Sequence, residues 1–340
     1  MLGVAVLGVD VSKATLSSSL LDPGTRRALW QAECPNTPCG IRSLLKKTPA
    51  QVAQVPLVLE PTGRYGQLVA KEARAAGRQV LLAEPRRAKA FLRSVQSRAK
   101  TDKLDSAGLA LFALSQPLPP YPLKSEMTEE LDQLLSARRG IAAALARLEQ
   151  QAKELPYAKE ALAEAIRSLR QQRDRLDGKI EELTRTKDPE RNSLAGAAQT
   201  LLKVPGIGPV TAAALAWRLC SRAFCHSDQF VAYIGLDIRI VQSGRKRGQL
   251  GLSKQGDGEL RRLLFNCARA ATLAKGSPFR EHYERERAKG LSRTAAHCAV
   301  ARKLARLSWS LVRHGGSYDP ERVYRRVEKK PESQSAPIVC

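Results

Sequence analysis

The sequence has few acidic and few aromatic residues. Its 340 residues include 33 acidic and 57 basic side chains, which gives a formal net charge of +24. An excess of this size indicates a polyanionic partner such as nucleic acid. Aromatic residues make up only 5% of the chain, so we expect phosphate contacts, rather than base stacking on aromatic platforms, to dominate binding.

Long hydrophobic runs are also missing. No apolar stretch approaches the ~18–20 residues of a membrane span. Residues 1–9 are apolar but have no basic residue before them, and Asp10 and Lys13 follow at once, which indicates a buried strand rather than a signal peptide. We therefore expect a soluble, cytoplasmic protein without a membrane partner.

Histidine and cysteine give little support for a catalytic or metal role. The four histidines form no paired motif. The seven cysteines are odd in number, and free thiols are the default in a chain without a secretory signal. Cys34 and Cys39, like Cys220 and Cys225, are spaced as C-x4-C, which is looser than the ligand spacing of most structural zinc sites. The role of both pairs stays open.

Charge and hydrophobic pattern divide the chain into regions. Residues 1–125 carry a net charge of +10, residues 126–190 of −2 and residues 191–330 of +17. We therefore expect the two ends to contact nucleic acid and the middle to contact protein. The predicted domains are an α/β domain at 1–122, a helical hairpin at 126–190 and a basic, mainly helical domain at 193–330, followed by a disordered tail at 331–340.

The first domain begins with strands and then alternates strands with helices. Apolar runs and turn signals predict strands at 3–9, 15–21, 27–32, 55–59 and 79–82. Helical patterns are predicted at 65–76, 85–95 and 103–115. This order is typical of a mixed sheet flanked by helices. A proline-rich linker at 117–122 ends the domain.

The middle region carries two narrow hydrophobic seams. Apolar residues from Leu134 to Leu155, and again from Leu162 to Leu183, recur at alternating three- and four-residue steps, as in the a and d positions of a coiled coil. Arg138 and Arg173 interrupt the seams, and Pro156 separates them. The pattern predicts an antiparallel coiled-coil hairpin, and the narrow stripe favours an oligomerisation arm over a helical pair packed on its own chain.

Four carboxylates in the first domain stand where metal ligands are needed. Asp10 ends the first predicted strand and Glu60 the fourth, so both can converge at one edge of the sheet. Asp102 and Asp105 open a helix at i and i+3 and share a face. Each alone could be a turn former, surface charge or helix cap. Together, in so basic a chain, they predict a site for two Mg²⁺ ions, which Mn²⁺ could replace.

Basic residues surround this acidic group and are expected to follow a phosphate backbone rather than form only a solvated helix face. They are Arg64, Arg86, Arg87, Lys89, Arg93, Arg98, Lys100 and Lys103.

The last domain contains two glycine-rich motifs. Residues 202–211 (LKVPGIGPVT) indicate a helix-hairpin-helix turn, whose free N–H groups suit a phosphate, although a plain helix connection has the same pattern. Residues 242–257 form a basic loop in which Ser243, or Ser253, could be a nucleophile or part of a phosphate-binding loop. Contacts to nucleic acid are expected from Gly206, Gly208, Arg245, Lys246, Arg247, Lys254, Arg261 and Arg262.

These motifs together resemble the insertion-sequence "one-ten" family of transposases, the DEDD-type recombinases guided by a bridge RNA. The four family acids fall on Asp10, Glu60, Asp102 and Asp105, and the signature S-G…G-x-S-K-x-G-D-x-x-L-R-R-L-L falls on residues 243–264. The resemblance selects Ser243, which precedes a glycine. Gln242, Arg245 and Ser106 depart from the family pattern, the first two at residues where many relatives have serine and glycine.

The resemblance implies a fold, a mechanism and partners. The fold is an RNase H-like (RuvC-like) domain, a coiled-coil arm and a serine transposase domain. Ser243 would attack a DNA phosphodiester and form a phosphoserine, with magnesium at the four acids. The implied partners are a structured bridge RNA, donor and target double-stranded DNA, and further copies of the chain, as dimers that pair into tetramers.

Two other functions compete with this interpretation. A Holliday-junction-type endonuclease would use metal-activated water and the four acids without Ser243. A non-catalytic RNA- or DNA-binding protein would need only the basic surfaces. A tyrosine nucleophile such as Tyr65 is a weaker alternative, because the sequence offers its hydroxyl no neighbouring base.

Overall fold

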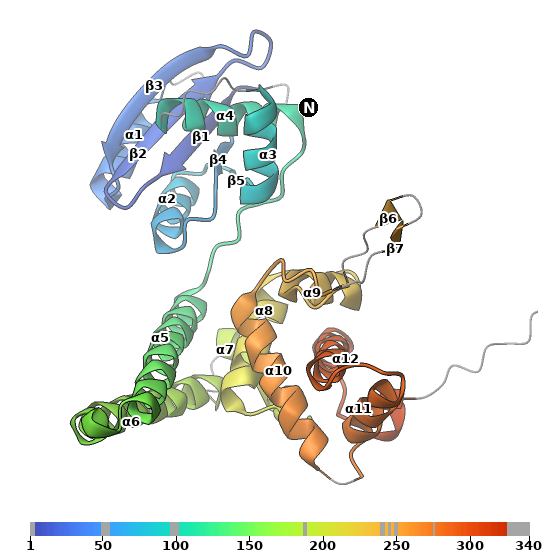
Figure 1. The fold of residues 1–340 in the computed structure, drawn as a ribbon. Helices are drawn as coiled ribbons and strands as arrows, with labels where there is room; N and C mark the ends of the chain where they lie inside the picture. Colours follow the sequence, from blue (N-terminus) through green and yellow to red (C-terminus); the bar gives the residue numbers. More distant parts are fainter. Residues whose placement is uncertain are drawn as a thin grey trace, which may run out of the picture. The chain divides into compact units, whose positions relative to one another are not determined.

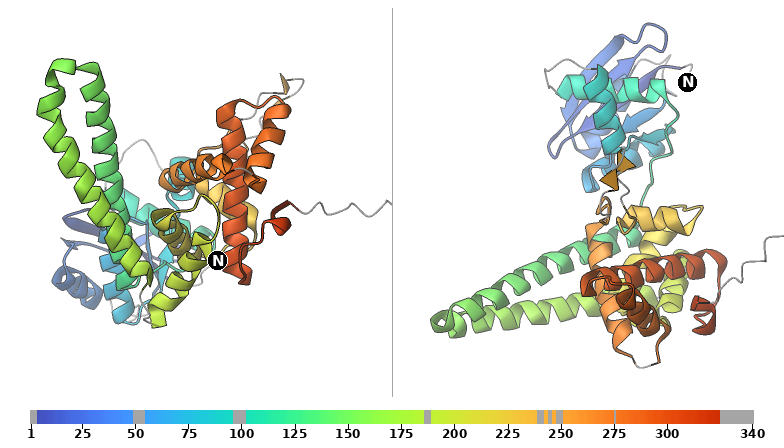
Figure 2. Two further views of the ribbon diagram at one scale, coloured as in Figure 1. Left: turned by 90° about the horizontal axis from the view of Figure 1, so that it is seen from below. Right: turned by 45° about the vertical axis from the view of Figure 1, so that its right-hand side comes forward.

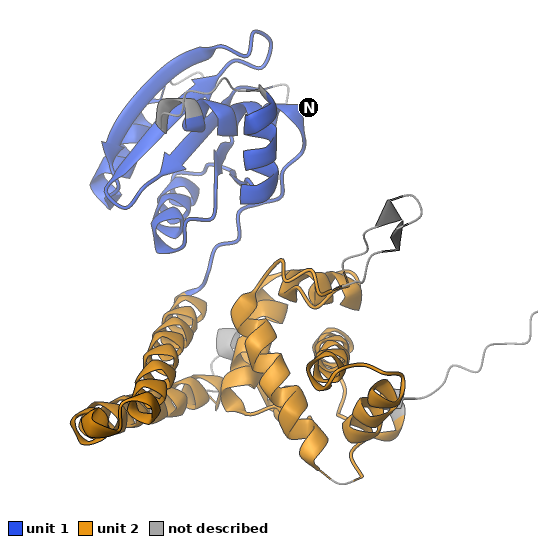
Figure 3. Ribbon diagram, viewed as in Figure 1, with its two compact units in different colours: residues 1–125 blue, residues 126–340 orange. Residues whose placement is uncertain are grey.

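The computed structural model describes residues 4–48, 55–95, 102–185, 189–238, 242–243, 246–247, 251–274 and 276–324, with only the backbone at some of them, including Asp102, Lys103, Ser243, Lys246 and Arg247. The chain forms two compact units, residues 1–125 and 126–340 (Figure 3). The helical hairpin therefore belongs to the same unit as the basic C-terminal region, whereas the sequence pattern treats them as separate domains.

Unit 1 is built on a five-stranded mixed sheet in the order β3-β2-β1-β4-β5, which confirms the sheet type predicted from sequence (Figure 1). The first three strands pair antiparallel, and β4 and β5 continue the sheet in parallel to β1. The strands are β1 (Val6–Val11), β2 (Thr15–Leu21), β3 (Ala28–Pro35), β4 (Leu57–Leu59) and β5 (Val80–Leu82).

Helices cover both faces of this sheet. One core joins Leu7 and Val9 of β1 to α1 (Pro38–Lys47) and α2 (Arg64–Ala75). A second core joins Val6 of β1 to α3 (Pro85–Val95) and α4 (Asp102–Ser115). Because successive strand residues point to opposite faces, β1 can be buried on both sides only if nearly all of its residues are apolar or small. Asp10 breaks that rule at the end of the strand.

Unit 2 begins with a long helical hairpin (Figure 2). The short 3-10 helix η2 (Pro156–Ala158) joins α5 (Glu126–Glu154) to α6 (Lys159–Arg185), so the chain turns at the proline that interrupts the hydrophobic seams. The polar interruption at Arg138 is explained by a pair of hydrogen bonds from its guanidinium to the Asp177 carboxylate on the facing helix. Arg170 and Glu149 form a second bridge between the helices, at 2.7 Å.

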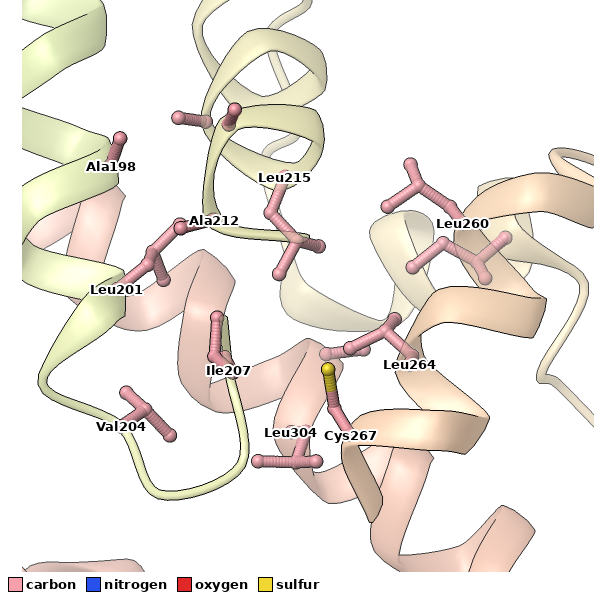
Figure 4. Close-up of a cluster of buried hydrophobic side chains, with 14 of the residues drawn as sticks. Ala198, Leu201, Val204, Ile207, Ala212, Leu215, Leu260, Leu264, Cys267 and Leu304 are labelled. Atoms are coloured by element: carbon pink, nitrogen blue, oxygen red, sulfur yellow. The ribbon is translucent and has the colours of Figure 1, made fainter. Parts of the chain in front are cut away.

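The rest of unit 2 is helical around one apolar core, which confirms the predicted mainly helical C-terminal region. In Figure 4, Leu201, Leu215, Leu264 and Leu304 come from four helices and meet in this core. The helices are α7 (Pro189–Leu202), α8 (Pro209–Ser221), α9 (Ser227–Ile234), α10 (Gly258–Leu273), α11 (Pro278–Ala288), α12 (Arg293–His314) and the 3-10 helix η3 (Glu321–Tyr324).

A short hairpin of β6 (Gln242–Ser243) and β7 (Lys246–Arg247) interrupts these helices between α9 and α10. Within the described part of the chain, no helix combines the length and the hydrophobicity that crossing a membrane requires.

Candidate active site

Asp10 and Glu60 lie at the same edge of the unit 1 sheet. β1 and β4 run parallel, and Val9 is the register partner of Leu59. Asp10 follows Val9 and Glu60 follows Leu59, so the two acids come at matching points of neighbouring strands. Both acids are partly exposed. Their meeting at one sheet edge follows from the parallel pairing, which the sequence pattern could only suggest.

The helix that carries the other two acids packs directly on β1. A Cβ atom at Gly8 would lie only 2.0 Å from the Ser106 carbonyl oxygen and 2.7 Å from the Ala110 nitrogen, so Gly8 faces the α4 backbone. Asp10 is two residues further along the strand and therefore points to the same face. The buried Ser106 hydroxyl also bonds to Ser19 on β2, at 2.8 Å. These contacts fix α4 against the strand that carries Asp10.

Asp105 precedes Ser106 on this helix, and its carboxylate is partly exposed. Asp102 begins α4, but its side chain lies outside the described atoms. Among the side chains that the structure describes, no group of three or more His, Cys, Asp or Glu residues is arranged to hold a metal ion. The oxygen donors of Asp10, Glu60 and Asp105 are nevertheless of the type that Mg²⁺ prefers, and the backbone brings their elements together.

We expect Gly8→Ala to destabilise unit 1 and to reduce catalysis. The added methyl group would overlap the α4 backbone, which must shift, at a cost of about 1–3 kcal/mol in the free energy of unfolding. The shift would also move Asp105 relative to Asp10. Thermal unfolding and DNA cleavage are the measurements. Gly140→Ala is the matched control, because a Cβ atom there meets nothing within 4 Å; equal melting temperatures for the two variants would contradict the close packing.

Cations lie beside the acidic edge. Arg64 begins α2 shortly after Glu60, and its Nη2 donates a hydrogen bond of 3.2 Å to the Tyr65 hydroxyl. This bond, and to a smaller extent the charges of Arg64 and Lys13, lower the pKa of Tyr65. The sequence offered no reason to link Tyr65 with Lys13, which lies in the turn after β1, so only the folded chain reveals this cluster.

The predicted phosphate track is described in part. Arg86, Arg87 and Lys89 are exposed on α3, whose buried residue at this point is Ala88. Arg98 and Lys100 lie outside the described residues, and of Lys103 only the backbone is described.

Ser243 lies on the β6–β7 hairpin of unit 2. Its register partner across the hairpin is Lys246, and Gln242 pairs with Arg247. The side chains of these four residues, and Arg245 altogether, lie outside the described atoms. The pairing nevertheless shows that the residue opposite the serine is a lysine.

The second serine, Ser253, has a structural partner at the base of this hairpin. Its hydroxyl donates to the Asp237 carboxylate, and its backbone N–H donates to the Asp237 carbonyl at 2.9 Å. Next to this contact, Ile238 and Leu252 form an isolated bridge. We call these two contacts, Ser253–Asp237 and Ile238–Leu252, the hairpin clasp. They join the two ends of segment 239–250.

Several signature residues after Ser253 hold the fold together. Gly256 adopts a φ of +133° and approaches the Tyr233 carbonyl, where a Cβ atom would lie 2.0 Å away. Asp257 caps α10 and binds Arg218 at 2.9 Å. Arg261 donates to the Ile234 carbonyl at 2.8 Å. Much of this motif therefore supports the clasp.

Two cations of the motif differ in their surroundings. Arg262 forms two hydrogen bonds to Glu259, at 2.6 and 3.0 Å, which raise its pKa. Lys254 is exposed, and its backbone has a φ of +52°. Lys254 is thus better placed than Arg262 for the nucleic-acid contact predicted for both.

The glycine turn between α7 and α8 packs against α10. Gly206 has a φ of +87°, and a Cβ atom there would lie 2.5 Å from the Cys267 carbonyl. Gly208 caps α8 and, with Thr211, hydrogen-bonds the Cys267 thiol, whose pKa burial raises. Both glycines are exposed to solvent. Packing accounts for Gly206, whereas a Cβ atom at Gly208 would meet nothing within 4 Å. The role of both glycines in phosphate binding stays a prediction.

Comparisons with known proteins cover both units. A model described as "Transposase" matches residues 7–155, and one described as "Transposase IS116/IS110/IS902 family" matches residues 198–284. A pilin gene-inverting protein of Moraxella bovis is 28% identical over 323 residues, covering 92% of this chain and 97% of that protein. A transposase for insertion sequence element IS1328 of Yersinia enterocolitica is 35% identical over 198 residues, covering 53% of this chain and 54% of that one.

A solved structure of Thermus thermophilus RuvC is similar to 34% of this chain and 99% of its own, with 13% identity and a TM-score of 0.29. The first family model extends through α5, the first helix of the hairpin, and the second begins within α7. The Moraxella protein matches nearly the whole chain. The acids of unit 1 and the serine signature of unit 2 fall inside the matched segments, and the chain belongs to the IS110 family of transposases.

Proposed function

We propose that this transposase is an RNA-guided recombinase that cuts and rejoins DNA through a covalent bond to Ser243. The observation that carries the proposal is the register of β1 and β4, which sets Asp10 and Glu60 side by side at the sheet edge on which α4 packs. The mixed sheet with helices on both faces also supports an RNase H-like domain. Magnesium, bound by Asp10, Glu60, Asp102 and Asp105, is part of the proposal.

The cleavage step follows from the nucleophile. The Ser243 hydroxyl oxygen attacks the phosphorus of a DNA phosphodiester, a phosphoserine bond forms, and the bond to the 3′ oxygen breaks. The serine proton is lost and the departing 3′ oxygen gains one. Lys246 is the register partner of Ser243, and we propose that its positive charge would stabilise the negative oxygen that develops in this step.

Rejoining reverses these bonds with a new strand. A 3′ hydroxyl attacks the phosphoserine, a phosphodiester forms, and the Ser243 oxygen leaves and regains its proton. In this proposal, the four acids of unit 1 contribute by binding the metal ions. Magnesium held there would supply positive charge that stabilises the phosphate oxygens in the transition state. Mn²⁺ is expected to replace it.

The proposed partners follow from charge and shape. Net charges of +10 and +17 on residues 1–125 and 191–330 suit two nucleic acids, which we assign to a structured bridge RNA and to donor and target DNA. The hairpin of α5 and α6, with its bridges Arg138–Asp177 and Arg170–Glu149, is a rigid arm suited to joining protomers as dimers and tetramers.

One assay tests the proposal as a whole. The protein is incubated with the RNA of its element, Mg²⁺, and supercoiled donor and target DNA, and the products are denatured. We expect protein–DNA adducts whose formation requires both the RNA and the metal ion. Free nicks without adducts would favour hydrolysis by activated water. Tight RNA binding without any cleavage would favour a binding protein.

A further inference from the structure

A basic pocket lies between α11 and α12 of unit 2. It has a volume of about 390 Å³, and five cations line it: Arg285 and Lys289 from α11, and Arg302, Lys303 and Arg306 from α12. The spacings of four residues in each helix place these side chains on facing stripes.

Charge in this pocket is poorly balanced. Among its described lining residues, Glu286 is the acid, and it forms an ion pair with Lys289 at 2.7 Å. Arg306 binds Asp228 on α9, at 2.8 Å. Burial lowers the pKa of Arg302 and of Lys303, which are both half-buried. Burial also lowers the pKa of the His282 imidazole. The lining therefore carries a net charge of +4.

The lining also indicates the class of ligand. The described lining contains no Phe, Tyr or Trp, and its one ring is the imidazole of His282, so cationic side chains dominate it. Arginine and lysine side chains match the oxygen atoms of a phosphate. The cavity is much larger than the ~30 Å³ share of one water molecule, so a phosphate with its attached sugar can enter.

The pocket is connected to the base of the Ser243 hairpin. Arg302 Nε donates to the Leu236 carbonyl at 3.0 Å, and the next residue, Asp237, is part of the hairpin clasp. Burial raises the pKa of the Cys298 thiol, while the charges of Arg302, Lys254 and Arg261 lower it. A cation of the pocket and two of the serine signature therefore act on the same thiol.

We propose that the pocket between α11 and α12 binds a backbone phosphate of the nucleic-acid strand that passes the base of the Ser243 hairpin. This proposal rests on the proposed function, which brings a nucleic-acid strand to the Ser243 hairpin. The phosphate can belong to DNA or to RNA, and the contact carries no sequence information.

The test is the salt dependence of binding. The Arg285→Gln/Lys303→Gln variant removes two lining cations and spares Arg302 and Arg306, which support the fold. Binding of a labelled DNA duplex, and of the RNA duplex of the same sequence, is measured without Mg²⁺. Loss of this one phosphate contact lowers the slope of log Kobs against log salt by about 0.9 and weakens binding on the order of tenfold at low salt.

The control is Arg280→Gln/Arg313→Gln, which removes one cation from each of the same helices outside the pocket lining. A slope that falls in the pocket variant and not in the control supports the proposal, and the duplex affected identifies DNA or RNA as the source. A wild-type slope with both duplexes, or an equal fall in the control, overturns it.

A single variant and a separate adduct assay complete the test of the pocket. If the double variant fails to fold, as judged by its thermal unfolding, Lys303→Gln alone is used, and a smaller fall in slope, of at most about 0.9, is expected. Adduct formation by the unchanged protein is measured separately. An unchanged slope with normal adducts rejects the phosphate site in the pocket but not the proposed function. Missing adducts reject the proposed function, and the slopes still test whether the pocket binds phosphate.

Discussion

Ser243→Ala is expected to abolish the covalent protein–DNA adduct and to lower strand transfer by a factor on the order of 10⁴ or more. Alanine removes the only oxygen that the side chain offers to the phosphorus. It leaves the β6–β7 pairing intact, because that pairing uses the backbone of Gln242, Ser243, Lys246 and Arg247. Denaturing electrophoresis of labelled DNA after incubation with RNA and Mg²⁺ measures the adduct.

Ser253→Ala is the matched control. It lies in the same signature, but its hydroxyl is bonded to Asp237 in the hairpin clasp. Losing that bond leaves a carboxylate with one fewer donor and should cost about 1–3 kcal/mol of stability. Adducts should persist, at a lower melting temperature. Adducts that survive Ser243→Ala and vanish in Ser253→Ala would transfer the nucleophile to Ser253.

Asp10→Asn and Glu60→Gln are expected to have the second largest effect. Each substitution keeps the shape of the side chain and removes the charge that binds a divalent ion. Losing several kcal/mol of transition-state stabilisation corresponds to a fall in cleavage on the order of 10³-fold or more. DNA binding should stay or strengthen, because the protein loses negative charge. Cleavage and binding are measured on the same preparations.

The control for the acids is Glu72→Gln on α2. Glu72 forms an ion pair with Arg42 at 3.5 Å, an exposed type of pair worth ~0–1 kcal/mol. It should leave cleavage unchanged, while a chelator should reproduce the effect of Asp10→Asn. Full cleavage by both acid variants would place the metal-dependent chemistry elsewhere in the protein.

Much of unit 1 could be predicted because its signals are local. Apolar runs and turn residues located all five strands, and the predicted helix at 65–76 corresponds to α2 (Arg64–Ala75). Helix α1 was not predicted, because the closely spaced Pro35 and Pro38 are more typical of a turn than of a helix. Thr37 in fact caps the helix by accepting from Gly40 N–H, and Pro38 is favourable in a first helical turn.

Residues of the candidate site could be predicted only where the sequence pattern that indicates them is local. The strand-end positions of Asp10 and Glu60 were readable, but the contact of α4 with Gly8 depends on residues about 100 apart in the chain. Likewise, no sequence pattern near Ser253 predicts its hydrogen bond to Asp237. The pocket on α11 and α12 was missed because each helix contributes only half of it, although the spacing of Arg285 and Lys289, and of Arg302 and Arg306, was a usable signal.

The hairpin clasp has a consequence for how this family can diversify. Ile238 and Leu252 pair at the foot of the serine segment, and Ser253 is tied to Asp237 beside them. The path of the chain on either side is therefore set independently of residues 239–250. We expect that segments from relatives can be exchanged here, provided that the spacing between Ser243 and Lys246 is kept, because a one-residue insertion between them would place another residue opposite Ser243.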